Sequence, residues 1–316
     1  MSTQSLPAQP RTRRRWPDAW LYAVAFFLLV QVFLYSYPHL RPGTVGWLCW
    51  MLGSDRLLWW IIAFGLLVIA VVWSLWRPPP GKLTRWRLFG VGAIVALAVT
   101  PLMYRVYPSS YEDRPSEVRF RLPLDGPILV GWGGNTPAVN YHVSAPAQRW
   151  AYDLVVAEDR QTHTGDGDRL ADYYCYDRPV LAPAAGEVVA VLDGQPDQPP
   201  GLLGGSPAGG NQIVIRVADG QYLFLCHLRR GTLQVQEGGQ VVSGQPVASV
   251  GNSGNTSEPH LHIHLQNTPN MNAGEGIPLY FHHYRCEGRL VERGMPTGGF
   301  SLDGPSGQIV SPAATP

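Results

Sequence analysis

Charged side chains are scarce in this chain. Lys, Arg, Asp and Glu make up 15% of the 316 residues, against roughly 25% in an ordinary soluble domain. The 24 basic and 23 acidic residues nearly cancel, which gives a formal net charge of +1. Such a balance excludes the broad basic surface that nucleic-acid binding requires. Part of the chain must avoid water, and no nucleic-acid partner is expected.

Cysteine and sequence repeats are also scarce. The four cysteines are too few for a disulfide scaffold, and no C-x-x-C spacing indicates a zinc ribbon or a thiol redox motif. Their pairing is left open by the sequence. The 35 Gly and 29 Pro follow no short period, which excludes collagen-like and repeat architectures. The cysteines are Cys49, Cys175, Cys226 and Cys286.

Long apolar runs, by contrast, are present in the first third of the chain. They cover about 19–37, 57–76 and 88–104, and none contains a charged residue. Each is long enough to cross a hydrocarbon core about 30 Å thick. Without charged side chains the spans offer no transport path. Residues 1–105 are therefore predicted to form a membrane anchor with three transmembrane α-helices.

The distribution of Lys and Arg around these runs predicts their orientation. Basic residues cluster before the first run and between the second and third, whereas the first loop holds only Arg41 and Arg56. Basic loops remain in the cytoplasm. An odd number of spans then places everything after residue 105 on the outer side of the membrane. The two clusters comprise Arg11, Arg13, Arg14, Arg15, Arg77, Lys82, Arg85 and Arg87.

The remainder of the chain has a different pattern. Short alternating apolar stretches, such as GEVVAVL and NQIVIRV, are separated by Gly, Pro, Asn and Asp. This alternation predicts an all-β domain over 106–303. Gly- and Pro-rich segments at 162–172 and 195–210 predict long surface loops, and 304–316 is predicted to be a disordered tail.

Histidines carry most of the functional information. The segment GNSGNTSEPHLHIHL places three of them at alternate positions after a Gly/Asn turn. On a strand such side chains face one way, about 7 Å apart. They either make ordinary hydrogen bonds or converge on a metal, and Zn²⁺ takes imidazole and carboxylate ligands with one position left for water. The candidate residues are His142, Asp153, His227, His260, His262 and His264.

The ordered series of motifs resembles the lysostaphin/LytM-type zinc metallopeptidases. VLAPAAGEVVAV, GNQIVIRV, YLFLCHL and GNSGNTSEPHLH follow one another within residues 140–265. The resemblance implies a compact antiparallel β-domain, related to the duplicated hybrid motif, with one Zn²⁺ in a groove. It also implies hydrolysis of peptide bonds in peptidoglycan cross-links, outside a bacterial cytoplasmic membrane, by a periplasmic or extracellular domain.

The resemblance further implies roles for single residues. Asp153 and His262 match the family's metal ligands, and His260 and His227 match its catalytic histidines. Four residues before Asp153, however, the family has a His ligand and this chain has Arg149, whose guanidinium cannot ligate a metal.

Three readings follow from Arg149. His142 takes the place of the missing ligand, or His264 does, or the chain holds no functional metal. In the last case it is a non-catalytic relative that binds wall peptides or activates another hydrolase. An export adaptor with a biotinyl-like fold is a further alternative, but such a fold needs a carrier lysine or long coiled-coil hairpins, and residues 181–267 contain no Lys.

Overall fold

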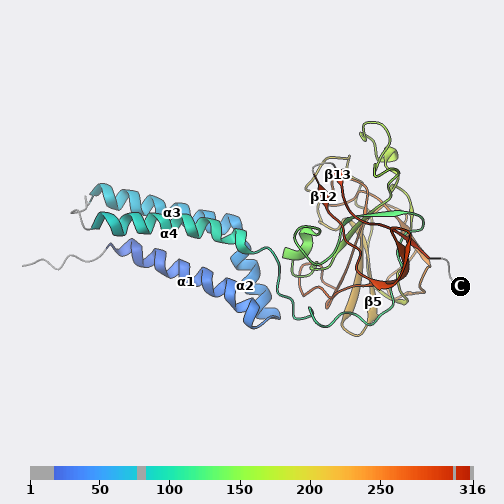
Figure 1. Cartoon of the computed structure of the whole chain (residues 1–316), viewed down its shortest axis with the longest axis horizontal. Helices are drawn as coiled ribbons and strands as arrows, with labels where there is room; N and C mark the ends of the chain where they lie inside the picture. Colours follow the sequence, from blue (N-terminus) through green and yellow to red (C-terminus); the bar gives the residue numbers. More distant parts are fainter. Residues whose placement is uncertain (1–17, 77–82, 302–303, 314–316) are drawn as a thin grey trace, which may run out of the picture. The chain divides into compact units, whose positions relative to one another are not determined.

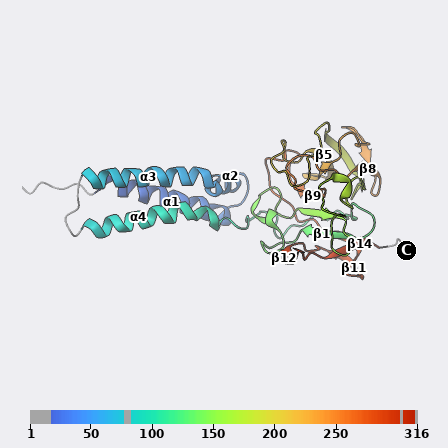
Figure 2. The ribbon, with the colours of Figure 1, turned by 90° about the horizontal axis from the view of Figure 1, so that it is seen from above.

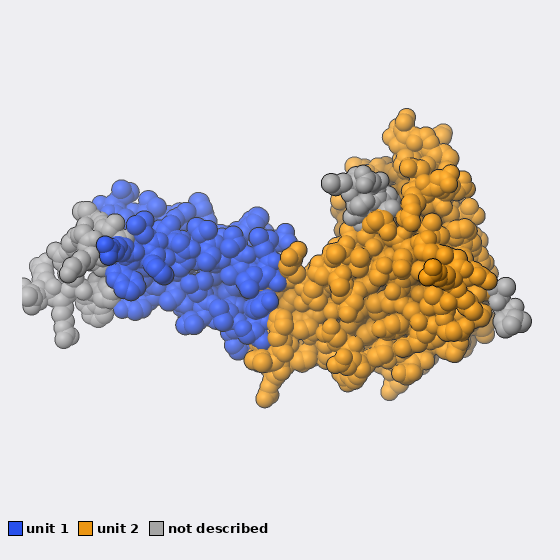
Figure 3. All heavy atoms as spheres, viewed as in Figure 1, with its two compact units in different colours: residues 1–36, 51–103 blue, residues 37–50, 104–316 orange. Residues whose placement is uncertain are grey.

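The computed structural model describes residues 18–76, 83–301 and 304–313, and Figure 1 shows its elements. The chain divides into two compact units, coloured in Figure 3: residues 1–36 with 51–103, and residues 37–50 with 104–316. The cluster at residues 11–15, and Arg77 and Lys82, lie outside the described residues. The orientation inferred from them therefore stays a prediction.

The first unit is helical. Its long helices are α1 (Ala19–Leu40), α3 (Arg56–Trp76) and α4 (Leu83–Val99), and a 3-10 turn, η1 (Thr100–Met103), extends α4. All three are long and apolar enough to cross a membrane, which confirms the three predicted helices. A shorter helix, α2 (Thr44–Ser54), has residues in both units. It was not predicted, because its 11 residues are too few for a span.

A buried ion pair joins the three long helices at one end. Arg87 on α4 donates from Nε to Asp18 Oδ2, which precedes α1, over 2.7 Å, and Trp73 on α3 donates to Asp18 Oδ1 over 2.7 Å. Each partner of such a pair is costly to remove alone, because the other charge would be left buried and unpaired.

The second unit is built on a ten-stranded antiparallel sheet in the order β11-β10-β14-β1-β2-β9-β6-β5-β4-β7 (Figures 1 and 2). Two pairs of short strands, β3 with β8 and β12 with β13, lie outside it. This architecture confirms the predicted all-β domain. The strands of the large sheet are β1 (Ile128–Trp132), β2 (Tyr152–Val155), β4 (Gly186–Leu192), β5 (Asn211–Ala218), β6 (Gln221–Leu228), β7 (Gln240–Val241), β9 (Leu261–Gln266), β10 (Phe281–Cys286), β11 (Arg289–Gly294) and β14 (Ile309–Pro312). The short strands are β3 (Pro179–Leu181), β8 (Pro246–Ser249), β12 (Phe300–Ser301) and β13 (Gly304–Pro305).

Strict alternation on β9 separates the core from the polar face. Leu261, Ile263 and Leu265 point into the main hydrophobic core. The residues between them, His262, His264 and Gln266, face the opposite side, because successive side chains of a strand alternate. These three are nevertheless buried. The second face of the sheet is therefore covered by protein, and each polar group on it needs a partner.

The C-terminal segment and the cysteines complete the description of the fold. The predicted disorder of 304–316 is wrong for Ile309–Pro312, which forms β14 between β1 and β10. The stretch Ile-Val-Ser-Pro carries one core residue, Val310, which is 1% exposed, and the Gly and Pro around it concealed this short signal. None of the four cysteines forms a disulfide.

Candidate metal centre

The pairing of β2 with β9 creates the centre of the site. In this antiparallel pair Asp153 lies directly opposite His262, and paired residues on neighbouring strands share a face of the sheet. Their side chains meet, with Asp153 Oδ1 and His262 Nδ1 separated by 2.8 Å. Both are buried, at 6% and 4% exposure.

A third donor comes from a loop. His142 lies on a 3-10 turn, η2 (Tyr141–Ser144), and its Nε2 is 3.6 Å from Asp153 Oδ2. One ligand atom each from His142, Asp153 and His262 lie within 4.8 Å of one another. Two imidazoles and one carboxylate, with room for a fourth ligand, form the donor set that suits Zn²⁺.

His264, the other candidate for the third ligand, lies behind His262. Its Nδ1 is 3.0 Å from His262 Nε2, the nitrogen on the far side of that ring from Asp153, and the ring stacks on Phe224. The structure therefore brings His142, and not His264, beside the carboxylate.

Two more histidines face the same place. His260 Nδ1 lies 2.8 Å from the Glu258 carbonyl oxygen and His227 Nδ1 lies 2.8 Å from the Ser253 carbonyl oxygen. A carbonyl oxygen can only accept, so both Nδ1 atoms carry hydrogen and each neutral ring keeps a lone pair on Nε2. His260 Nε2 is 3.6 Å from Asp153 Oδ1, and the rings of His227 and His260 are 4.7 Å apart.

His227 also has an unusual backbone. Its φ is +60°, a left-handed conformation that costs a non-glycine residue roughly 1–2 kcal/mol. Such strain clusters at functional sites, where it directs a side chain. Here it occurs near the end of β6. The His227 backbone N–H donates to the carbonyl oxygen of Gly209, at the end of the preceding loop, over 2.9 Å.

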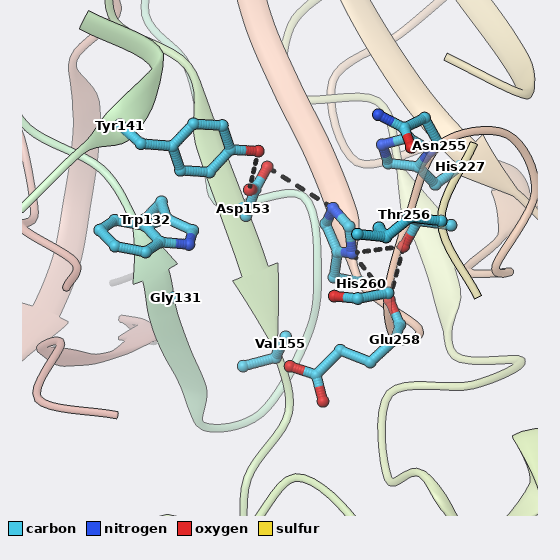
Figure 4. Close-up of a pocket in the computed structure, with 12 residues that line it drawn as sticks. Gly131, Trp132, Tyr141, Asp153, Val155, His227, Asn255, Thr256, Glu258 and His260 are labelled. Atoms are coloured by element: carbon cyan, nitrogen blue, oxygen red, sulfur yellow. Dashed lines mark hydrogen bonds and ion pairs between the residues drawn. The ribbon is translucent and has the colours of Figure 1, made fainter. Parts of the chain in front are cut away.

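A groove of about 290 Å³ opens over these side chains. Figure 4 shows Trp132 and Tyr141 along one wall, Thr256, Glu258 and His260 along the other, and Asp153 between them. The loop predicted over 195–210 contributes Leu203 to the rim.

Burial sets the charges in the site. It lowers the pKa of His142 to about 3 and lowers the pKa of His227 well below its usual value. For Asp153, burial opposes ionisation, but His142 and His260 and the hydrogen bond from His262 outweigh it and hold the pKa of the carboxyl well below its usual range. Neutral imidazoles beside an ionised carboxylate are the forms that bind a metal.

Arg149 does not belong to this group of donors. Its side chain is 1% exposed, donates from Nε to the Tyr107 carbonyl oxygen over 2.9 Å and from Nη1 to Asn135 Oδ1 over 2.5 Å, and stacks on Trp150. The Tyr107 backbone N–H in turn donates to Val143, within η2, over 2.8 Å. Arg149 thus supports the turn that carries His142.

Several residues of this region were not predicted from the sequence. Trp132, Tyr141 and Glu258 line the groove, and two buried amides, Asn140 and Gln266, hydrogen-bond the histidines. Only the amides had a usable signal: Asn140 lies two residues before His142, and Gln266 continues the alternation of β9. The groove walls come from separate loops, and no local pattern links them.

The comparisons with known proteins match a family to part of the β-domain. The model of Peptidase family M23 matches residues 171–273, which include His227, His260 and His262. The β-domain resembles peptidase family M23 over these residues, and we call it the M23 domain. The matched segment begins after His142 and Asp153, so these two rest on the geometry of the site. No curated protein matches the chain.

Several solved structures resemble parts of the M23 domain. The catalytic domain of the M23 protein EnpA from Enterococcus faecalis is 18% identical, with 50% of this chain and 94% of that chain covered and a TM-score of 0.31. The lysostaphin catalytic domain from Staphylococcus simulans is 20% identical, with 47% and 86% covered and a TM-score of 0.29. The SpoIIQ-SpoIIIAH pore-forming complex is 16% identical, with 51% of this chain and 89% of that chain covered and a TM-score of 0.31. At these scores no correspondence of residues follows.

We predict that Arg149→Met destabilises the M23 domain without removing its metal. Losing the guanidinium removes its charged hydrogen bonds to the Tyr107 carbonyl oxygen and to Asn135, a loss of about 1.5–3 kcal/mol. Metal content and thermal unfolding of the full chain, purified in detergent, measure the two effects separately. Loss of metal at unchanged stability would instead place Arg149 in the metal site.

We also predict that a lower pH reduces the stability of strands β6 and β9 in the metal-free protein. The folded pKa values of His142, His227 and His264 are lowered by burial, below the value of about 6.5 in an unfolded chain. Unfolding therefore takes up protons below about pH 6.5, and stability is lost as the pH falls from there toward the folded values. Each histidine contributes at most about 1.4 kcal/mol per pH unit.

Hydrogen exchange of β6 and β9 at pH 7.5 and 5.5, in the full chain with chelator, measures this loss as a lower free energy of opening. After correction for intrinsic exchange rates, equal opening energies at the two pH values would show that these imidazoles are not held neutral by burial.

Proposed function

We propose that this protein is a membrane-anchored zinc endopeptidase that cuts peptide bonds in the cross-links of peptidoglycan. The observation that carries the proposal is the convergence of His142, Asp153 and His262 within 4.8 Å, where Asp153 lines the groove together with His227 and His260. The substrate class comes from the likeness to lysostaphin-type peptidases, and a groove open along its length suits a peptide chain.

The donor set fits a zinc ion. His142 and His262 would supply imidazole nitrogens and Asp153 a carboxylate oxygen. The lowered pKa values of His142 and Asp153 keep the first neutral and the second ionised, as metal binding requires. A bound zinc ion would polarise the scissile carbonyl and acidify a water molecule. A fourth coordination position would be left for water or substrate.

The two remaining histidines have the form that proton transfer needs. His260 presents a lone pair on Nε2 toward Asp153, so it can accept the proton of an attacking water as general base. The ring of His227 lies 4.7 Å from that of His260. Once its Nε2 has taken up the proton that His260 accepts from the water, His227 can hydrogen-bond the developing oxyanion or pass that proton to the leaving amine. Both imidazoles are held by backbone carbonyls and need not reorient.

The proposed location follows from the anchor. Three helices that can span a membrane precede the M23 domain, and the Lys/Arg distribution favours a cytoplasmic N-terminus. An odd number of spans places the domain in the periplasm or outside the cell, where peptidoglycan lies. The non-catalytic alternative rested on Arg149, and the position of His142 beside Asp153 favours a complete set of donors instead.

The ligand assignment predicts which variants lose zinc. Asp153→Ala and His142→Ala each remove one of three protein ligands, so the full chain should lose stoichiometric zinc at micromolar concentration. Elemental analysis after dialysis measures the metal per chain, and His163→Ala, a variant outside the site, serves as the control. One tightly held zinc per chain in His142→Ala would exclude His142 as a ligand.

The catalytic assignment predicts variants with the opposite behaviour. His260→Ala and His227→Ala leave all three ligands in place, so zinc content should stay at one per chain. Release of peptides from purified peptidoglycan should fall by about 10²-fold or more, as expected when a general acid or base is lost. Undiminished release by His260→Ala would overturn its role as base.

A further inference from the structure

The stretch between the first two apolar helices folds with the M23 domain. Residues 37–50, which cover the end of α1 and the start of α2, belong to the same compact unit as residues 104–316 (Figure 3). We infer that Trp50 in this stretch is a positioning residue for His142, because it holds the turn that carries this proposed ligand. The inference rests on the proposed zinc site and adds to its support a residue that lies between the apolar helices in the sequence.

The indole of Trp50 is held in one orientation. The residue is 1% exposed, and its ring packs edge-on against the rings of Tyr104 and Tyr107, with centroids 4.8 Å and 5.4 Å away. Edge-to-face contacts of this kind are favourable and set the relative orientation of aromatic rings. The one hydrogen that an indole can donate lies on Nε1. It is directed at the Ser144 carbonyl oxygen, over 2.8 Å.

The turn η2 receives hydrogen bonds from outside itself. It is a 3-10 turn of four residues, a form with poorer hydrogen-bond geometry than an α-helix. Its end is closed by the bond from the Ala145 N–H to the His142 carbonyl oxygen, over 2.8 Å. Its last two carbonyl groups accept from elsewhere, Val143 from the Tyr107 backbone N–H and Ser144 from the indole. The position of the proposed ligand therefore depends on two donors that lie far from it in the sequence.

A buried carboxylate holds the same stretch at a second point. Glu275 is 3% exposed and accepts a hydrogen bond from the Gly43 backbone N–H over 3.2 Å. The hydroxyl groups of Tyr107 and Ser110 donate to the same carboxylate, and a carboxyl group buried this deeply needs such donors. Because Tyr107 also bonds η2, Glu275 links the stretch between the helices to the turn through a single residue.

Breaking the bond from Trp50 should let η2 open more often. A neutral hydrogen bond changes an equilibrium about 2- to 10-fold, so the open form of the turn should become more populated by that factor. An open turn carries His142 away from Asp153, and a bound metal would be released more readily through it. The part of the chain that forms the zinc site therefore includes residues 37–50.

The first measurement uses the full chain in nanodiscs without metal. Trp50→Phe keeps an aromatic ring against Tyr104 and Tyr107 and removes the hydrogen donated to Ser144. Hydrogen exchange, resolved to single residues by mass spectrometry, should be about 2- to 10-fold faster at the Ala145 N–H, while the amides of β6 and β9 keep their rates. Unchanged exchange at Ala145, or equal acceleration in β9, would overturn the inference.

A matched control comes from the helical unit. Trp59 is also buried, at 2% exposure, and its Nε1 donates to the Leu52 carbonyl oxygen over 2.9 Å. Both residues belong to the first unit. Trp59→Phe loses the same kind of bond and should leave exchange at Ala145 unchanged. Acceleration there equal to that in Trp50→Phe would show a general effect of losing an indole donor, and would contradict a specific role for Trp50.

The second measurement follows the metal. Zinc loaded onto the full chain is transferred to an excess of chelator, and its release should be about 2- to 10-fold faster from Trp50→Phe and unchanged in Trp59→Phe. Unchanged release from Trp50→Phe, with faster exchange at Ala145, would refute the link between the indole and the metal ligand. If the unmodified chain binds no zinc, the proposed function fails, while the exchange measurement still tests whether Trp50 holds the turn.

Discussion

The site depends on one register, the pairing of Asp153 on β2 with His262 on β9. Because side chains alternate along a strand, a slip of one residue would turn His262 into the core and bring Leu261 or Ile263 to the polar face. The apolar half of β9 prevents this slip, since Leu261, Ile263 and Leu265 are all but fully buried in the core. The hydrophobic pattern thus holds a carboxylate opposite an imidazole, a contact that has little stability of its own in a dry interior.

Burying so many polar groups around the site is tolerable because each imidazole has a defined partner for one of its ring nitrogens. All four site histidines direct one ring nitrogen away from the groove, toward Asn140, Ser253, Glu258 or His264. The partners are oxygens, or a ring whose own direction is fixed by an oxygen. An unsatisfied buried donor costs about 1–3 kcal/mol, so these bonds stabilise the fold and, at the same time, direct the remaining lone pairs to one point.

The sequence supports prediction where a pattern is local. Alternation in LHIHLQ is enough to place His262 and His264 on one face of a strand, and uncharged length is enough to place three helices. It does not reveal β14, whose four residues form a strand only because the edges of β1 and β10 are available. Nor does it decide whether His142 or His264 is the third ligand. The proximity of His142 to Asp153 depends on how η2 folds back, and the separation of His264 from Asp153 depends on the His262 ring that lies between them.

Arg149 shows how a substituted ligand position can still serve the site. The residue keeps a charge in the interior, where it is stabilised by the Tyr107 carbonyl, Asn135 and the Trp150 ring. Tyr107 bonds Val143, one residue after His142, and its hydroxyl is held by buried Glu275. The segment that leaves the last apolar helix is therefore part of the support for η2. In the proposed site Arg149 therefore acts on the turn that carries His142 and not on the metal, so the third ligand depends on a residue that cannot itself bind a metal.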